Sequence, residues 1–159
     1  MKLIDTHQHL IYKNEATYGW TNDIPSLQSD FTLVDYKNLT KDYNILGTLF
    51  MECGVDDLDY KNESNFINSL MQKSGSGIKG LILSIRPEEN IEFDKWLEES
   101  KSLGVVGYRR VLHTEPDELS QQNTFRENIS KIGKIGKPFD LCFREDQLKI
   151  PLELSKSCD

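Results

Sequence analysis

The sequence has no apolar run long enough to cross a membrane. Its longest apolar stretch, residues 78–85, is interrupted by Lys79, whereas a membrane-spanning helix needs about 20 such residues. The N-terminus also lacks a basic segment followed by an apolar stretch of about 7–15 residues, the pattern of a secretion signal, because Asp5 and His7 follow almost at once. We therefore expect a cytoplasmic protein without a membrane partner.

Basic residues and cysteines are also scarce. There are 19 Lys and Arg against 26 Asp and Glu, the formal net charge is −7, and no basic run is longer than Arg109-Arg110. This balance argues against binding to a nucleic-acid backbone. Cys53, Cys142 and Cys158 are odd in number and widely spaced, which is typical of reduced thiols rather than of a disulfide framework.

What the sequence does contain is an alternation of two patterns. Short, nearly continuous apolar runs are typical of strands covered on both faces, and they occupy residues 2–6, 45–51, 78–85, 105–112 and 138–143. The segments between them have apolar residues three to four apart, the spacing of amphipathic helices, at residues 56–72, 91–103, 124–135 and 145–157. The order predicts an α/β fold with a parallel sheet, either an open doubly wound sheet or a closed barrel.

The length limits how much of a barrel is present. An eight-fold (β/α) barrel takes about 250 residues, and this single domain of 159 residues shows five strand–helix units. An open five-stranded sheet would explain the same count.

Residues 10–32 form a long polar segment with Tyr18 and Trp20. The segment either belongs to an active face, where its aromatic rings could stack on a ligand, or is a surface insertion whose rings pack against the domain.

The pattern Asp5-Thr6-His7-Gln8-His9 follows the first apolar run. In an extended strand, side chains two residues apart share a face, so His7 and His9 converge. Neutral imidazoles bind zinc and similar divalent metals, and a nearby carboxylate can orient such a ring. The pattern indicates a metal site with an activated water, although both histidines could instead be hydrogen-bonded polar groups at a strand end.

Several motifs together resemble the amidohydrolase superfamily. They are the opening D-T-H-Q-H-L, the strand Gly107-Tyr108-Arg109-Arg110-Val111-Leu112, Glu115-Pro116-Asp117 and Phe139-Asp140-Leu141. The similarity covers the whole chain, and it is greatest to the predicted metal-dependent TIM-barrel hydrolases that include sugar-lactone hydrolases. In that family the chain continues into a strand with a histidine and a later strand ending in an aspartate, so the resemblance implies a barrel truncated to about five β/α units.

The resemblance also implies roles for particular residues. His7 and His9 would hold a divalent metal, zinc or similar, or bind the substrate directly. Arg109 would bind a substrate carboxylate or lactone oxygen, or else pair with Asp140 inside the barrel. Glu52, at the end of the second strand, would line the pocket, although an exposed strand-end glutamate is the commoner case. His113 follows the fourth strand, and we do not expect it to be catalytic.

The implied function is hydrolysis of a sugar lactone, or a related cyclic ester, by an activated water. Two alternatives remain at this point. A metal-dependent nuclease or phosphoesterase also opens with H-x-H on a first barrel strand, but the acidic composition weighs against it. The chain could also be a non-catalytic half-barrel whose exposed strand edges and apolar wall make it self-associate as a homo-oligomer.

Overall fold

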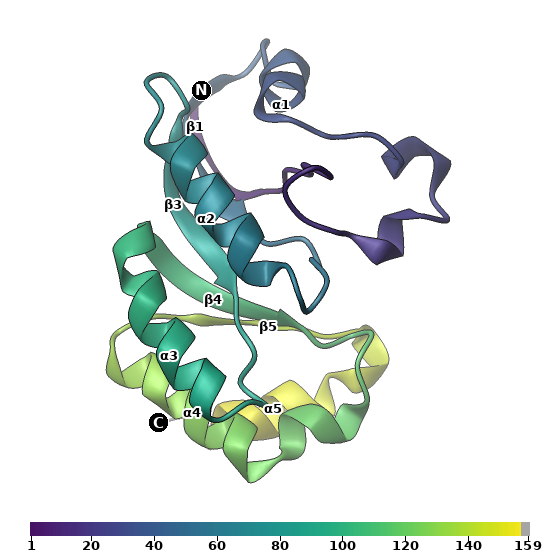
Figure 1. Ribbon diagram of the computed structural model, residues 1–159, viewed down its shortest axis with the longest axis vertical. Coiled ribbons are helices and arrows are strands. Elements are labelled where there is room, and N and C mark those ends of the chain that lie inside the picture. The colour runs from purple at the N-terminus through teal and green to yellow at the C-terminus, as the bar shows by residue number, and fades with distance from the viewer. Residues whose placement is uncertain (157–159) are drawn as a thin grey trace. The chain divides into compact units, whose positions relative to one another are not determined.

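The computed structural model describes residues 1–156. The chain forms two compact units, Met1–Ser84 and Ile85–Asp159 (Figure 1). Cys158, expected from the sequence to be a reduced thiol, lies outside the described residues. No helix in the described part of the chain is both long enough and apolar enough to cross a membrane.

The first unit contains three strands that run parallel in chain order. They are β1 (Lys2–Gln8), β2 (Asn44–Met51) and β3 (Ile78–Ser84). Between β1 and β2 lie two short 3-10 turns and the helix α1 (Leu33–Leu39), and α2 (Tyr60–Met71) connects β2 to β3 (Figure 1). Each parallel connection therefore passes through a helix, as a parallel sheet requires.

The core of the first unit lies between α2 and the strands. Helix α2 buries Ile67 and Leu70 on one face, at the three-residue spacing that places side chains on the same stripe. Strand β3 contributes Leu81 and Leu83, which are fully buried, and β2 contributes Phe50. These apolar contacts fix the positions of the carboxyl ends of the strands, where the polar residues singled out from the sequence lie.

The pairing of β1 with β2 is irregular just before the histidines. Asp5 pairs with Thr48 and Gln8 pairs with Phe50, so three steps along β1 match two steps along β2. An extra residue of this kind is a β-bulge, which turns side chains away from the regular alternation and often lies beside active sites. The bulge spans His7, and it therefore sets the direction of that imidazole.

Residues 10–32 are tied to the first unit at several points. Ile11 and Phe31 exchange two backbone hydrogen bonds of 2.8 and 2.9 Å. The Asp59 carboxylate accepts hydrogen bonds from the backbone N–H and the hydroxyl of Thr17, which hold its pKa below the ordinary value. The Asp56 carboxylate accepts one from the Gly19 N–H at 2.9 Å. The long segment is thus anchored to the residues that follow β2.

The second unit contains two parallel strands, β4 (Val105–Val111) and β5 (Phe139–Cys142). Its helices are α3 (Ile91–Glu99), α4 (Asn123–Lys134) and α5 (Lys149–Lys156). Gly104 has φ 69° and joins the turn after α3 to β4. This left-handed conformation is nearly strain-free only for glycine.

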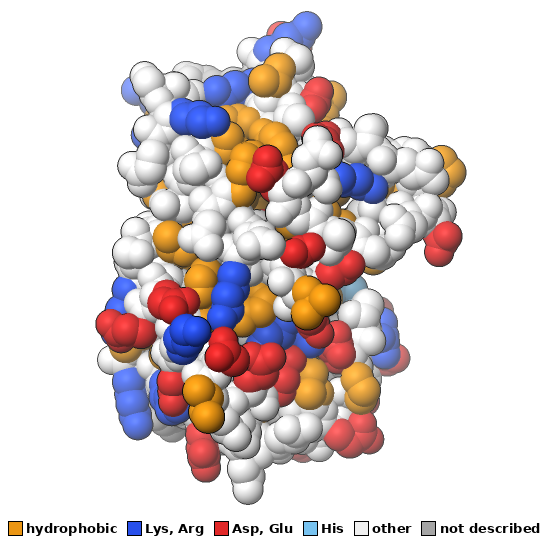
Figure 2. All heavy atoms as spheres, viewed as in Figure 1, with side chains coloured by type: hydrophobic (Ala, Val, Ile, Leu, Met, Phe, Trp, Pro, Cys, Tyr) orange, Lys and Arg blue, Asp and Glu red, His pale blue; other side chains and the backbone are white. Residues whose placement is uncertain are grey.

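On the face shown in Figure 2, acidic and basic side chains lie intermixed over the second unit. One such pair is Lys131 and Asp94, whose charged atoms are 2.5 Å apart.

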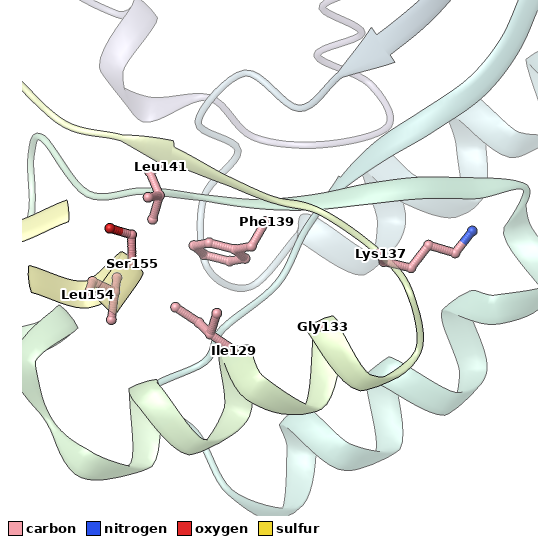
Figure 3. Close-up of a pocket in the computed structure, with 7 residues that line it drawn as sticks. All are labelled: Ile129, Gly133, Lys137, Phe139, Leu141, Leu154 and Ser155. Atoms are coloured by element: carbon pink, nitrogen blue, oxygen red, sulfur yellow. The ribbon is translucent and has the colours of Figure 1, made fainter. Parts of the chain in front are cut away.

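An apolar cluster joins α4, α5 and the end of β4 in the second unit. Leu112, Phe125, Ile129 and Leu154 form this cluster, and Phe139 packs against it from β5. A hollow of about 270 Å³ opens beside the cluster, between α4, α5 and β5. Figure 3 shows Phe139 and Ile129 lining it, with Lys137 at one end.

The alternation of strands and helices expected from the sequence is confirmed. All five strands form within two residues of their expected ends, and the four expected helical segments correspond to α2 to α5, although α4 begins one residue before its expected segment. The sequence did not predict α1. It also predicted single helices where the structure has the separate 3-10 turns Ser100–Leu103 and Glu145–Gln147 beside α3 and α5. The architecture is α/β, of the (β/α)-barrel type, with about five β/α units.

Helix α5 offers a matched test of the core of the second unit. Leu154 is 1% exposed in the apolar cluster, whereas Leu152, on the same helix, is 58% exposed. We predict that Leu154→Ala lowers the free energy of unfolding by about 2–5 kcal/mol, because it leaves a cavity. Leu152→Ala should change it by less than about 0.5 kcal/mol. Urea unfolding followed by circular dichroism measures both, and equal effects would contradict the assigned packing of α5.

Candidate functional site

The two imidazoles at the end of β1 point toward one another. The His7 Nε2 and His9 Nε2 atoms are 3.1 Å apart, and the rings meet edge to face with their centroids 4.7 Å apart. Two nitrogens bound to one tetrahedral zinc ion would lie about 3.3 Å apart, given Zn–N bonds of about 2.0–2.1 Å. The separation therefore fits two ligands of a single metal ion.

The tautomer of His9 is set by the backbone of β2. His9 Nδ1 lies 2.9 Å from the carbonyl oxygen of Met51. A carbonyl can only accept a hydrogen bond, so in the neutral ring Nδ1 carries the proton and Nε2 presents its lone pair. A hydrogen bond from the second nitrogen to a carbonyl is the usual way in which proteins orient a metal-binding histidine. The Nε2 lone pair of His9 is therefore available either to a metal ion or to a hydrogen bond from the His7 ring.

Asp5 supports this arrangement without contacting either imidazole. Its carboxylate accepts a hydrogen bond from the backbone N–H of His7 at 3.0 Å and another from the Tyr36 hydroxyl at 2.6 Å. Partial burial, together with the Asp5 carboxylate, raises the pKa of Tyr36. The sequence led us to expect that Asp5 could orient a ligating ring, and in the structure it holds the backbone of His7 instead.

The helix that carries Tyr36 is held mainly by its first turn. Thr32 caps α1: its hydroxyl accepts a hydrogen bond from the Asp35 N–H, and the Asp35 side chain accepts one from the Thr32 N–H. The Asp35 carboxylate also accepts a hydrogen bond from the Thr32 hydroxyl, and this bond, followed by the one from the Thr32 N–H, lowers the pKa of Asp35. A capping box of this kind stabilises a short helix, and here it fixes the position of the Tyr36 hydroxyl.

The donor set near the histidines is incomplete as a metal centre. Within residues 1–156, no group of three or more His, Cys, Asp and Glu side chains is placed to hold a metal ion. Catalytic zinc sites have three protein ligands and an open position. The residues present fit two of those ligands, His7 and His9, which are the two that the sequence predicted.

Glu52 follows β2 directly and is buried. Its side chain is 1% exposed, and its carboxylate accepts a hydrogen bond from the Gly54 N–H at 3.0 Å. The commoner interpretation, an exposed glutamate at a strand end, is therefore wrong. Charged side chains are seldom fully buried unless they are paired, and whether Glu52 lines a pocket stays a prediction.

Arg109 lies on β4 in the second unit, where it pairs with a carboxylate. Its Nε is 3.2 Å from the Asp140 carboxylate, and its Nη2 is 2.8 Å from the Cys142 sulfur. Asp140 is its direct neighbour across the β4–β5 pair. The alternative in which Arg109 pairs with Asp140 thus occurs in the structure. This ion pair holds the guanidinium in place. That Arg109 also binds an oxygen of the substrate stays a prediction.

Arg110 is held by different carboxylates. Its guanidinium contacts Glu88 at 2.9 Å and Glu115 at 3.3 Å. Adjacent residues of a strand point to opposite faces, and Arg109 and Arg110 accordingly pair with different carboxylates. Two carboxylates around one buried guanidinium form an ion-pair network, so we assign Arg110 a structural role.

The aromatic residues of the long segment pack onto the first unit. Tyr18 is 4% exposed, and its hydroxyl donates a 2.9 Å hydrogen bond to the buried Glu63 carboxylate of α2. Burial is the main cause that raises the pKa of Tyr18, and the negative charge of Glu63 adds to it. Trp20 remains half exposed and donates its indole N–H to the Cys53 carbonyl. For Tyr18, the packing interpretation is therefore the better one.

Three functional neighbours were missed from the sequence. Tyr36 and Glu63 lie 31 and 45 residues along the chain from Asp5 and Tyr18, their respective partners, and no local signal connects them. Cys142 was treated only as one of the reduced thiols. Its position two residues after Asp140 places both side chains on one face of β5, and that spacing could have associated it with Arg109.

The buried Tyr18 hydroxyl predicts a loss of stability at alkaline pH. Since the folded state raises its pKa, the folded chain keeps the proton that the unfolded chain releases above pH about 10. Stability should therefore fall as the pH rises, by roughly 1 kcal/mol between pH 10 and 11 from this group alone. Denaturant unfolding at pH 10 and 11 measures this loss for the wild type and for Tyr18→Phe. The free energy of unfolding of the variant should fall by roughly 1 kcal/mol less than that of the wild type. The same fall in both proteins would contradict burial of the hydroxyl.

Comparison with solved structures identifies the fold. Amidohydrolase 2 from Bifidobacterium longum subsp. infantis is 20% identical, with TM-score 0.72, over 98% of this chain and 57% of that chain. An amidohydrolase from Burkholderia multivorans with bound HEPES is 16% identical, with TM-score 0.83, over 100% of this chain and 54% of that chain. A second crystal form of the Burkholderia multivorans amidohydrolase, with bound zinc, is 14% identical, with TM-score 0.78, over 100% of this chain and 55% of that chain.

A probable 2-pyrone-4,6-dicarboxylic acid hydrolase from Acinetobacter baumannii, with citric acid bound, is 14% identical, with TM-score 0.64, over 87% of this chain and 48% of that chain. The sequence itself matches no family model and no curated protein. The chain spans about half the length of these solved structures. The resemblance to the amidohydrolase superfamily is thus confirmed as a shared fold, and the chain has the fold of about half of an amidohydrolase.

Proposed function

We propose that the protein is a hydrolase of the amidohydrolase type that opens a sugar lactone, or a related cyclic ester, by attack of an activated water. The observation that carries this proposal is the pair of Nε2 atoms of His7 and His9, 3.1 Å apart. The Met51 carbonyl fixes the His9 tautomer that a metal requires. In parallel α/β folds, ligands bind at the carboxyl ends of the strands, where this pair lies.

The comparisons support the metal and the type of substrate. One of the matching amidohydrolases was crystallised with bound zinc. Another match is a probable hydrolase of a pyrone dicarboxylic acid, and a 2-pyrone ring is a cyclic ester. When bound, a zinc ion lowers the pKa of a coordinated water to about 7 and polarises a carbonyl, which suits ester hydrolysis at neutral pH.

The proposed roles follow from the surroundings of each residue. His7 and His9 hold the metal, and Asp5 positions His7 through its backbone N–H. Arg109 in the second unit binds a carboxylate or lactone oxygen, because its guanidinium is rigidly held by Asp140 and retains several donors. Glu52 is a buried carboxylate after β2 that can accept or deliver a proton.

The proposed compartment is the cytoplasm. Neither Cys53 nor Cys142, the two cysteines that the structure describes, forms a disulfide. Reduced thiols are typical of proteins kept in a reducing environment. We therefore expect the protein to need a reductant during purification. The reductant has to be removed before metal binding is measured.

Zinc binding tests the histidine pair separately from catalysis. We predict that the chain binds one zinc ion and that His9→Asn weakens binding at least ~10-fold, because a ligand is lost. Tyr36→Phe should weaken it less, since Tyr36 acts only through Asp5. His113→Asn is the matched control, because His113 is the third histidine and lies in the other unit. Isothermal titration calorimetry measures all four proteins, and equal affinities for wild type and His9→Asn would exclude the proposed site.

Hydrolysis tests the proposed reaction. Water adds to the lactone carbonyl, the ring C–O bond breaks, and the product carboxylic acid releases one proton, so a pH indicator follows turnover. We predict that sugar γ-lactones are hydrolysed in the presence of zinc and that Arg109→Met mainly raises KM, by ~10-fold or more, through loss of a charge-assisted contact. A phosphodiester serves as the control substrate. Zinc binding without lactone hydrolysis would reject the substrate and retain the metal site.

A further inference from the structure

A second chemical cluster lies in the second unit around Cys142. The Cys142 sulfur is 2.8 Å from Arg109 Nη2 and 3.3 Å from His113 Nδ1. From these contacts we propose that Cys142 is a nucleophilic thiol that reacts with hydroperoxides, with His113 as the base that takes the thiol proton and Arg109 as a positioning residue. The proposal shares Arg109 with the proposed hydrolase site, but it involves neither the histidine pair nor a metal.

The register of the two strands explains why these groups meet. Arg109 pairs with Asp140 and Val111 pairs with Cys142, so Asp140 and Cys142 lie on the same face of β5 as Arg109 does on β4. His113 follows two residues after Val111, and its carbonyl accepts a hydrogen bond from the Arg144 guanidinium. The thiol is thus surrounded by groups that regular strand geometry and a backbone contact hold in place.

The chemistry of the neighbours favours reaction at this sulfur. The thiolate is the nucleophilic form of cysteine, and basic side chains beside the sulfur favour it. The Arg109 guanidinium donates toward the sulfur, and the neutral His113 ring can accept the thiol proton when Nδ1 is unprotonated. Cys142 is also partly exposed, so a small oxidant can reach it. Reactive cysteines combine these two properties, a basic environment and access.

The proposed step conserves atoms and electrons. The thiol proton passes to His113, and the sulfur attacks the terminal oxygen of the hydroperoxide. A sulfur–oxygen bond forms while the oxygen–oxygen bond breaks, and the leaving oxygen takes the proton from His113. Cys142 is oxidised by two electrons to a sulfenic acid, and the hydroperoxide is reduced to an alcohol, or to water when hydrogen peroxide is the oxidant.

Cys53 provides an internal contrast in the first unit. It is in the same class of partial exposure as Cys142. Its sulfur lies 4.0 Å from a Glu63 carboxylate oxygen and 3.6 Å from the Leu10 carbonyl. These two neighbours are hydrogen-bond acceptors. The contacts given for the two thiols therefore differ in kind, with acceptors beside Cys53 and basic side chains beside Cys142, while their exposure is similar.

The test compares the two thiols in single-cysteine proteins. Cys53→Ser with Cys158→Ser leaves Cys142, and Cys142→Ser with Cys158→Ser leaves Cys53. Each protein is treated with hydrogen peroxide at pH 7, and the sulfenic acid is trapped with dimedone and quantified by mass spectrometry. We expect Cys142 to react at least ~10-fold faster than Cys53. Equal rates, or a faster Cys53, would overturn the proposal.

Variants of the neighbours separate a chemical role from a structural one. In the protein that retains only Cys142, Arg109→Met and His113→Asn should each slow trapping by ~5-fold or more, and Arg109→Lys should restore most of the rate because it restores the positive charge. Folded variants that react as fast as their parent, or no recovery with lysine, would contradict the proposal. If a serine variant does not fold, peroxide treatment and dimedone trapping of the wild-type chain, followed by peptide mapping, give the ratio of rates for the two thiols.

Discussion

The parallel pairing of β1 with β2 is the constraint on which the rest of the candidate metal site depends. It brings the carbonyl of Met51 to the ring of His9, and that one hydrogen bond determines which nitrogen of the ring faces His7. The bulge in β1 and the contacts of Asp5 then aim the second ring. A site of this kind needs few dedicated residues, because the strand register performs most of the positioning.

The same principle operates in the second unit, with a different chemical result. The register of β4 and β5 places a guanidinium, a carboxylate, a thiol and an imidazole along one edge. Asp140 neutralises part of the charge of Arg109, while Cys142 uses another nitrogen of the same guanidinium. One rigid cation can therefore serve both an anionic substrate oxygen and a sulfur, since its donors point in several directions.

The sequence predicted the strands and the larger helices because their apolar residues recur at the spacing of each element. It failed at α1, which buries none of its residues, exposes Val34 and Leu39, and begins at the capping pair Thr32 and Asp35. His7 and His9 were recognised because they are close in the sequence. The burial of Glu52 and the contact of Tyr36 with Asp5 were not predictable, because they depend on residues brought together only by the folded chain.

The anchoring of residues 10–32 also bears on how this protein can change over time. The segment is attached in part through its own backbone: the N–H groups of Thr17 and Gly19 bind carboxylates outside it, and the Thr17 carbonyl accepts a hydrogen bond from the Asp56 N–H. Backbone attachments survive most substitutions of the side chains that they carry. Many positions along this segment can therefore vary while its path is retained, which is the freedom that a scaffold needs if related chains are to recognise different small molecules.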